Sequence, residues 1–341
     1  MTDRFCGFTY EQLLHVMDLS GFEDHHALKA VTNYYRRKIT DFRSMENLPK
    51  AVRELLGSRF RSELYTPVKH EESADKSVKY LFVNDEGNVF ESVFIPDRKR
   101  KTICVSTQSG CRMGCPFCLT GKYGFRGNLT AGDIVGQVMS VPFSGEITHV
   151  VFMGMGEPLD NIDEILKACR ILTASWGLAI SQENVTVSTV GIIPAARRFL
   201  DESGCNLTLS LFSPFAEERA EVVPAERKNP ARDIINLLRE YPKKRKRRFS
   251  VAYVMIGDLN DTDAHLEGLI KLLHGSEIRV NLLPYHVTGE DKFNPSSAER
   301  MDHFRLKLTG SGISASVRRS RGADISAACG LLASGLRNHG E

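Results

Sequence analysis

Three cysteines stand close together in this sequence and could hold a metal centre. They are Cys111, Cys115 and Cys118, in the run Cys-Arg-Met-Gly-Cys-Pro-Phe-Cys. Four thiolates saturate a 4Fe–4S cluster, so three cysteines on one short loop would leave one iron open for chemistry. Structural zinc is normally held by two Cys-x2-Cys pairs, and the sequence has no second pair. The spacing therefore favours an iron–sulfur cluster over a zinc site or unrelated buried thiols.

Other polar residues follow apolar runs that have the character of strands. The segment Gly154–Pro158 ends one run with two glycines, which permit close approach of a ligand, and with Glu157, which could accept hydrogen bonds from an ammonium group. Ser188 and the run Ser210–Phe212 end the next two, where hydroxyl groups could meet a ribose or a carboxylate. Each feature is weak alone. Beside the cysteine loop they predict a ligand site.

Two further cysteines lie in suggestive contexts. Cys104 precedes the cysteine loop, and Cys329 follows a glycine-containing segment rich in small residues. A redox pair needs two thiols that can approach each other, with a thiolate on at least one. Small buried side chains are the common alternative, and spacing leaves the two interpretations open. We expect Cys6, Cys169 and Cys205 to be buried and inert.

Composition bounds the class of protein. The chain has 341 residues and a mass of 38.1 kDa, with 42% hydrophobic and 26% charged residues, which is ordinary for a soluble globular protein. No apolar run reaches membrane-spanning length, and the first residues lack the pattern of a secretory signal. Eight cysteines without such a signal favour a reducing cytoplasm, where thiols serve metals and catalysis. We therefore expect a cytoplasmic protein.

The distribution of charge is more informative than the net charge of +3. Several basic runs could neutralise phosphates, although a single run is usually a solvated face. The basic runs are Arg36–Lys38, Arg98–Lys101, Lys243–Arg248 and Arg318–Arg321. Together they favour a surface that faces RNA.

Hydrophobic periodicity divides the chain into two parts. Residues 1–96 read as an accessory module of helices, near 10–18, 25–38 and 47–56, followed by a β-hairpin over 79–96. A short linker, 97–101, leads to residues 97–341, where six strand candidates alternate with helix candidates. Six β-then-α units predict a parallel sheet with helices on its outer face, closed into a partial (β/α)6 barrel and not into a full eight-stranded one. Functional groups should then gather at the carboxyl ends of the strands.

These motifs together resemble the radical S-adenosylmethionine (SAM) RNA methyltransferases of the RlmN and Cfr family, over nearly the whole chain. The stretches that carry the resemblance are FESVFIP (90–96), CVSTQSGCRMGCPFCLTGKYGFRGNLTAGDIVGQV (104–138), VVFMGMGEPLDN (150–161), VTVSTVGIIP (185–194) and RSRGADISAACGLL (319–332). The first and last are not general features of radical SAM proteins, so the resemblance is specific to this family.

The resemblance implies a reaction and assigns roles. Cys329 corresponds to the cysteine that takes a methyl group from a first SAM, and a second SAM at the cluster yields a 5′-deoxyadenosyl radical that activates this methyl group. The carbon radical then adds to C2 or C8 of an adenine in ribosomal or transfer RNA. Cys104 corresponds to the cysteine that resolves the covalent adduct through a transient disulfide with Cys329, and Glu91 to the proton acceptor. The residues that correspond to SAM-contacting positions are Gly156, Glu157, Ser188, Ser210, Leu211, Phe212 and His286.

The chemistry of adenine explains why such a reaction would use a radical. C2 and C8 of adenine are not nucleophilic, so a radical route avoids a barrier that polar methyl transfer would meet, and restoring the aromatic ring requires a base. From the residues alone, a glutamate such as Glu91 in a hairpin is usually solvated. The resemblance also implies an external one-electron reductant such as flavodoxin or ferredoxin, and nothing in the sequence demands more than a monomer.

The sequence departs from the family pattern at three positions. Phe212 stands where the family usually has histidine, His286 where it has asparagine, and Val190 where it has serine. These changes affect the predicted SAM and substrate surroundings and leave the five functional cysteines intact. Two alternatives remain: the same radical chemistry on a small molecule or peptide, and a non-catalytic RNA-binding protein with a structural cluster.

Overall fold

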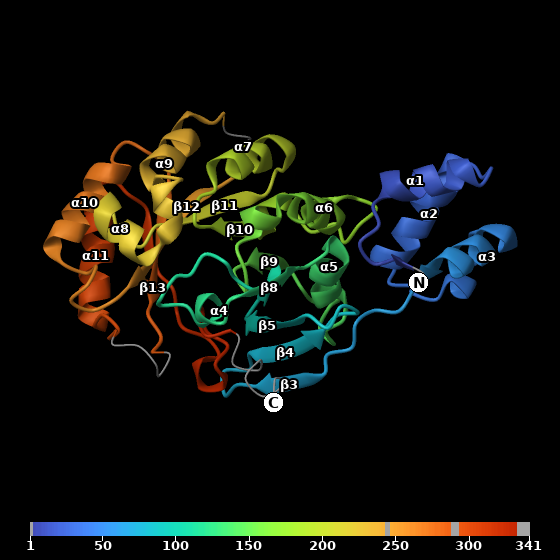
Figure 1. The fold of residues 1–341 in the computed structure, drawn as a ribbon, viewed down its shortest axis with the longest axis horizontal. Coiled ribbons are helices and arrows are strands. Elements are labelled where there is room, and N and C mark those ends of the chain that lie inside the picture. The colour runs from blue at the N-terminus through green and yellow to red at the C-terminus, as the bar shows by residue number, and fades with distance from the viewer. Residues whose placement is uncertain (1–2, 243–245, 288–292, 333–341) are drawn as a thin grey trace.

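A computed structural model describes residues 3–242, 246–287 and 293–332 (Figure 1). One large sheet runs through the molecule, helices cover its outer face, and three N-terminal helices form a lobe at one end (Figure 1). The predicted partial barrel of alternating strands and helices is confirmed. No helix of the described residues has the length and apolar character needed to cross a bilayer.

The N-terminal lobe contains the three helices expected from periodicity. They are α1 (Tyr10–Leu19), α2 (Asp24–Tyr35) and α3 (Lys50–Arg59). Thr9 caps α1, because its side chain accepts from the Gln12 amide while the Gln12 side chain accepts from the Thr9 amide. The lobe is closed by a short parallel pair, β1 (Asp3–Arg4) with β2 (Phe60–Arg61). Its aromatic core is centred on Phe5, whose ring contacts those of Tyr34 and Phe42.

The main sheet has ten strands in the order β14-β13-β12-β11-β10-β9-β6-β5-β4-β3. From β6 to β14 neighbours are parallel, and β3 to β6 are antiparallel. The strands are β3 (Lys69–Glu72), β4 (Val78–Val83), β5 (Val89–Asp97), β6 (Arg100–Cys104), β9 (His149–Phe152), β10 (Val185–Thr189), β11 (Asn206–Ser210), β12 (Phe249–Met255), β13 (Arg279–Pro284) and β14 (Ala315–Val317). A separate pair is formed by β7 (Gln108–Gly110) and β8 (Phe125–Asn128).

Helices follow the parallel strands, as the alternation predicts. They are α4 (Leu119–Lys122), α5 (Ala131–Met139), α6 (Ile162–Thr173), α7 (Ile193–Glu202), α8 (Ala216–Val222), α9 (Ala231–Glu240), α10 (Asp263–Leu273) and α11 (Ala298–Gly310). On β10 the outward residues Val185 and Val187 are fully buried under these helices, whereas Ser188 faces the concave side and is half-buried.

The sheet is strongly curved. Burial is the main cause that lowers the pKa of Arg100 on β6, and Arg318 and then Arg248, which precedes β12, act in the same direction. Three strands separate β6 from β12, so a flat sheet would hold these residues about 19 Å apart. The electrostatic effect of Arg248 on Arg100 across these strands indicates that the sheet curves and brings the two side chains toward each other.

The predicted hairpin is part of this sheet. β4 and β5 pair as expected, and β5 continues into β6 through a tight turn in which Asp97 pairs with Arg100. The expected linker at 97–101 is therefore wrong, because these residues end one strand and begin the next. The helical lobe is distinct, whereas the hairpin lies next to the barrel strands. A domain boundary at residue 96 stays a prediction.

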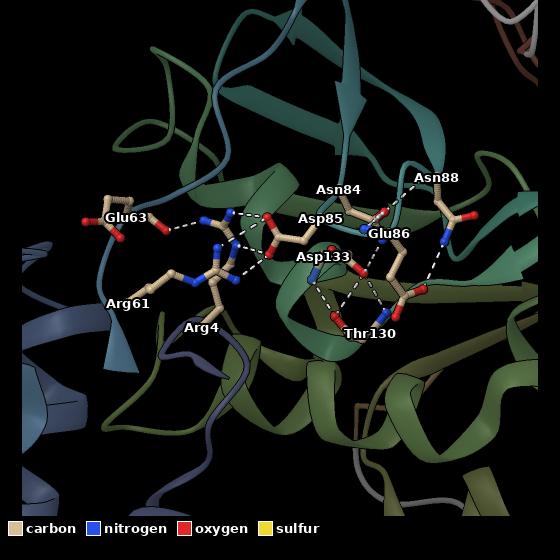
Figure 2. A network of polar contacts seen from close by, with 9 residues as sticks. All are labelled: Arg4, Arg61, Glu63, Asn84, Asp85, Glu86, Asn88, Thr130 and Asp133. Atoms are coloured by element: carbon tan, nitrogen blue, oxygen red, sulfur yellow. Dashed lines mark hydrogen bonds and ion pairs between the residues drawn. The ribbon is translucent and has the colours of Figure 1, made fainter. Parts of the chain in front are cut away.

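A polar network joins the lobe to the hairpin turn (Figure 2). Arg4 and Arg61 both bind the carboxylate of Asp85, with nitrogen–oxygen distances of 2.9 and 2.6 Å (Figure 2). The neighbouring Asn84 donates to Asp133 at the start of α5 over 3.2 Å (Figure 2). The turn is therefore tied both to the lobe and to the barrel.

Candidate active site

The three clustered cysteines lie on the loop between β7 and α4. Cys115 is buried, and Cys111 and Cys118 are half-buried. The helix after the loop is bonded to the C-terminal segment: the Leu119 amide donates to the Gly330 carbonyl over 2.9 Å, and Thr120 donates to the Leu332 carbonyl over 2.8 Å. The cysteine loop and the segment that carries Cys329 thus form one structural unit.

The chemistry of these thiols fits an iron–sulfur cluster. Burial raises the pKa of Cys111 to about 12 and that of Cys115 further, and neighbouring thiolates add to both shifts. Thiolates at these positions would therefore need a positively charged metal centre beside them. Among the described residues, no three His, Cys, Asp or Glu side chains gather closely enough to hold a single metal ion. Apolar side chains surround the loop: Phe212, Val222, Val223, Ile256 and Tyr285.

The segment Gly154–Pro158 follows β9 at the carboxyl end of the sheet. A Cβ atom at Gly154 would lie 2.7 Å from the Ser106 hydroxyl, and one at Gly156 only 2.5 Å from Gln108. Gly156 also has a φ of 96°, which favours glycine. These glycines therefore let the segment pack against the chain after β6. The expected close approach of a ligand to these glycines stays a prediction.

Glu157 is buried at the same edge of the sheet. Its carboxylate accepts from the Thr189 hydroxyl at 2.5 Å and from the amides of Val190 and Leu159, each at 2.9 Å. Burial raises its pKa to about 7, although the three donors favour the charged form. The carboxylate therefore fixes the end of β10, and a cation beside it would favour its ionised form.

Three of the other predicted SAM-contacting residues meet at neighbouring strand ends. The hydroxyls of Ser188 and Ser210 are 3.2 Å apart. Phe212 has a φ of 68° and stacks on Phe117 of the cysteine loop, with ring centroids 5.4 Å apart. Leu211 has its side chain in the main core, so it can offer the site only its main chain.

His286 follows β13, farther along the sheet edge. Its Nε2 atom lies 3.0 Å from the hydroxyl of Ser320, and burial lowers the pKa of its imidazole. This contact joins the end of β13 to the C-terminal segment. The structure thus gathers Glu157, Ser188, Ser210 and Phe212, and it joins His286 to the segment of Cys329.

Arg219 was not predicted, yet it organises these strand ends. It is fully buried and donates to the carbonyls of Val190 at 2.6 Å, Leu211 at 2.7 Å and Ser210 at 3.0 Å. It also pairs with Glu226, whose carboxylate caps α9 through the Ala231 amide at 2.8 Å. No sequence signal marks it, because a buried arginine and a solvated one have the same helical spacing.

Cys104 and Cys329 interact electrostatically. Burial is the main cause that raises the pKa of Cys104, and the neighbouring Cys329 raises it further. Surrounding protein also raises the pKa of Cys329, where Cys118 acts in the same direction and Arg318 opposes it. Cys329 is nevertheless exposed, so protein surrounds it without closing it off. These effects indicate that Cys104 and Cys329 lie in the same region, and the Leu119–Gly330 bond holds the segment of Cys329 against the helix after the cysteine loop. Their roles as resolving and methyl-carrying cysteines stay predictions.

Glu91 lies on the same face of the sheet as Cys104. Val93 pairs with Cys104 across β5 and β6, and Glu91, two residues before Val93, points to the same side. Its side chain has no exposed surface. The expectation from the residues alone, a solvated glutamate in a hairpin, is wrong, because β3 and β4 extend the sheet beyond it.

The remaining inert cysteines are as expected. Cys6, Cys169 and Cys205 are all buried. Cys6 donates to the Gly132 carbonyl at the start of α5, and none of the three is near the cysteine loop in the described contacts.

The concave face carries an unusual concentration of arginine. Arg100 is repelled by both Arg248 and Arg318, and His149 is repelled by Arg100 and Arg248. Asp97 is the acid that offsets Arg100, and it is also approached by Arg321 at 3.7 Å. Within the run Lys243–Arg248, residues 243–245 lie outside the described residues. Arg247 is buried and bonds to main-chain carbonyls, so it is not free for phosphate.

Comparison with known proteins agrees with this geometry. Residues 105–273 match the radical SAM superfamily. A protein of Parabacteroides distasonis named "Probable dual-specificity RNA methyltransferase RlmN" is 42% identical over 329 residues, which are 96% of each chain. The dual-specificity RNA methyltransferase RlmN of Syntrophotalea carbinolica is 39% identical over 326 residues, 95% of this chain and 88% of that one.

A solved structure shares the whole fold. The crystal structure of a radical SAM methyltransferase from Sphaerobacter thermophilus superposes with a TM-score of 0.89 at 36% identity, and covers 97% of this chain and 99% of that one. Radical SAM enzymes use a 4Fe–4S cluster and SAM. The chain therefore belongs to the RlmN family of radical SAM RNA methyltransferases.

Proposed function

We propose that this protein methylates a ring carbon, C2 or C8, of an adenine in ribosomal or transfer RNA, through a methylated Cys329. The observation that carries the proposal is the pair of hydrogen bonds from Leu119 and Thr120 to the segment of Cys329. These bonds hold a carrier cysteine next to the loop of the three cluster cysteines. A cluster with only a structural role would not require a further cysteine, from a segment distant in sequence, beside its loop.

Cys111, Cys115 and Cys118 would hold the 4Fe–4S cluster, and the strand ends beside them would hold SAM. The bound cluster would supply the electron that cleaves SAM. Apolar packing around the loop excludes water from this chemistry. Glu157 offers a carboxylate to the SAM ammonium group, and Ser188 and Ser210 offer hydroxyls. Gly156, Leu211, Phe212 and His286 complete the proposed SAM surroundings.

Cys329 would accept the methyl group, and Cys104 would release the product. In the first step a Cys329 thiolate displaces the sulfonium of SAM, so that a new sulfur–carbon bond replaces the old one. Arg318 supports this step, since it favours the thiolate of Cys329. Cys329 is near enough to Cys104 to raise the pKa of that thiol, which supports Cys104 as the partner in a transient disulfide.

Glu91 would accept the proton that the adenine ring loses. Its side chain shares a face with Cys104, so base and resolving cysteine lie on the same side of the sheet. Burial removes competing water from its carboxylate. This is the arrangement expected of a general base that acts beside the resolving thiol.

An RNA substrate is supported by the arginines on the concave face. Arg318 interacts with both Cys329 and Arg100, so the cationic group begins at the carrier cysteine. Mutually repelling arginines favour a polyanion, because phosphates relieve the repulsion. Nothing comparable favours a small neutral molecule or a peptide. An external one-electron reductant such as flavodoxin or ferredoxin, a monomer, and a cytoplasmic location complete the proposal.

Nucleoside analysis tests this function. Ribosomal and transfer RNA from a strain that lacks the gene should lose a methyladenosine, and the wild-type gene should restore it. A C329A variant should not restore it, whereas C169A, which alters a buried cysteine outside the site, should. An unchanged nucleoside profile in the deletion strain would refute the RNA reaction, and full restoration by C329A would refute the carrier role.

A further inference from the structure

Four charged residues form a line from solvent to Glu91. Lys69 lies 2.7 Å from Glu71, Glu71 lies 3.0 Å from Lys79, and Lys79 lies 3.8 Å from Glu91, measured between nitrogen and carboxylate oxygen. The exposed fraction of these side chains falls along the line from 55% to 34%, 8% and 0%. Charges of alternating sign thus lead from the surface to a carboxylate with no exposed surface.

Strand register explains the line. Lys79 on β4 pairs with Glu71 on β3 and with Val93 on β5. Because Glu91 lies two residues before Val93, it is the diagonal neighbour of Lys79 on the same face. Val93 pairs in turn with Cys104. Lys79 therefore lies in the same cross-strand row as Cys104, two strands away, with Val93 between them.

A buried carboxylate needs this partner. Moving a carboxylate out of water costs several kcal/mol, and without compensation the group takes up a proton. An opposite charge within about 4–6 Å favours the charged form. Among the described strand pairs, the titratable groups on this face near Glu91 are Glu71 and Lys69 from β3, Lys79 from β4 and Cys104 from β6. Of these, Lys79 is the cation nearest to the carboxylate.

We infer that Lys79 is a positioning residue that keeps Glu91 as a carboxylate, and thereby able to accept the adenine ring proton. The inference rests on the proposed role of Glu91. In the step concerned, the ring C–H bond breaks, its electron pair stays with the ring, and the proton forms an O–H bond on Glu91. This transfer needs no oxidant. The Lys79 ammonium group also pairs with Glu71, at 3.0 Å.

Two measurements on the full-length protein test this inference. The first follows the ionisation of Glu91 by infrared titration of protein labelled with 13C-glutamate, with E91Q subtracted. In K79M the carboxyl should ionise at a pH at least one unit higher, a tenfold change in its proton affinity, since an ion pair shifts this equilibrium by about 1–3 units. K79R should stay close to wild type, and K69M, the matched loss of an exposed cation on the same line, should leave the titration unchanged.

The second measurement is the pH dependence of methyladenosine formation in a single turnover, with covalent protein–RNA adduct followed on denaturing gels. K79M should move the midpoint to higher pH and accumulate adduct below it, while SAM cleavage without RNA stays at the wild-type rate. An infrared midpoint at the wild-type pH in K79M would overturn the inference.

Controls separate the possible failures. If K79M does not fold, E71Q provides the test, because it removes a negative charge and leaves Lys79 to pair with Glu91. In E71Q the Glu91 carboxyl should ionise with a midpoint at or below the wild-type pH. A midpoint at a higher pH would overturn the inference. If E91Q forms methyladenosine at the wild-type rate, the proposed role of Glu91 fails. The infrared titration still decides whether Lys79 holds the carboxylate.

Discussion

Phe212 stacks on Phe117, with ring centroids 5.4 Å apart and planes 12° from parallel. Phe117 belongs to the cysteine loop, and Phe212, two residues after the end of β11, has a left-handed conformation with a φ of 68°. Such a backbone costs about 1–3 kcal/mol in a residue with a side chain, so the surroundings must compensate for it. The Asn260 side chain donates to the Phe212 carbonyl over 2.8 Å and helps to hold it. The Phe212 ring thus links the segment after a strand end to the cysteine loop.

A double-mutant cycle between Phe117 and Phe212 should therefore show coupling. We expect F117A and F212A each to lower the free energy of unfolding, and the pair to interact by about 0.5–1.5 kcal/mol, the usual value for an aromatic contact beyond area burial. Denaturant unfolding of anaerobically purified protein measures it. Strict additivity of the two losses would contradict the proposed link. F212A should also retain less iron, because the loop loses its support.

Arg219 should matter for both stability and SAM. R219M removes donors to the Val190, Ser210 and Leu211 carbonyls and leaves Glu226 buried without its partner. Breaking a buried pair in this way costs about 3–5 kcal/mol. We expect a matching loss in the free energy of unfolding, and SAM affinity at least about tenfold weaker, equivalent to about 1.4 kcal/mol.

Companion variants distinguish charge from geometry. R219K keeps the charge but loses the planar fork, so we expect it to remain close to R219M in SAM affinity. The double variant R219M/E226M removes the unpaired carboxylate and should recover part of the stability. Wild-type SAM affinity in R219M, measured by calorimetry, would show that the strand ends hold their shape without it.

The elements with strong periodicity could be predicted from the sequence. Helix α9, Ala231–Glu240, and strand β12, Phe249–Met255, belong to the predicted alternation of strands and helices, because each places apolar residues toward the core in the period of its own structure. Strand β14 has three residues, and none of them is fully buried, so its sequence shows no hydrophobic pattern from which a strand could be predicted. Its pairing with β13 depends on contacts distant in sequence.

The residues of the candidate site likewise include some that the sequence could predict and some that it could not. Cysteine spacing could indicate the cluster, because the ligands lie on one loop and their number carries the chemistry. The burial of Glu91 could not be foreseen, because it depends on β3 and β4 extending the barrel sheet. Arg219 and Lys79 were missed for the same reason: their partners lie on other elements, and a cation in a helix or a strand is normally solvated.

Glu157 should make stability depend on pH in a defined direction. Burial raises its pKa to about 7 from 4.5, so the folded protein binds this proton more tightly than the unfolded chain. The resulting stabilisation is complete below pH 4.5 and is lost as the pH rises through about 7. Wild type should therefore lose stability relative to E157Q between pH 5 and 8, by about 3 kcal/mol at most, since one pKa unit corresponds to about 1.4 kcal/mol.

Anaerobic denaturant titrations of both proteins without SAM measure this difference. E217Q changes an exposed carboxylate at the start of α8 and serves as the control, with the same pH dependence as wild type. Parallel curves for wild type and E157Q would contradict the expectation. Added SAM should reduce the difference, because its ammonium group favours the ionised form of Glu157.

The segment of Cys329 should be held in place by Asp324. This carboxylate accepts from the Ser73 hydroxyl at 2.6 Å and from the Ala74 amide at 3.0 Å, both in the turn between β3 and β4. In D324A both bonds are lost. At about 1 kcal/mol for each hydrogen bond, the segment should open about 30-fold more often, and S73A, which removes one bond, about fivefold.

Hydrogen exchange at the amides of Gly322 and Ala327, which are bonded to Asp75 and to the Gly322 carbonyl, reports this opening. D324N keeps an acceptor oxygen and should fall between wild type and D324A. Methylation of Cys329 by SAM should slow in the same order, because the carrier cysteine spends less time beside the cysteine loop. Unchanged exchange in D324A would mean that the bonds from Leu119 and Thr120 hold the segment by themselves.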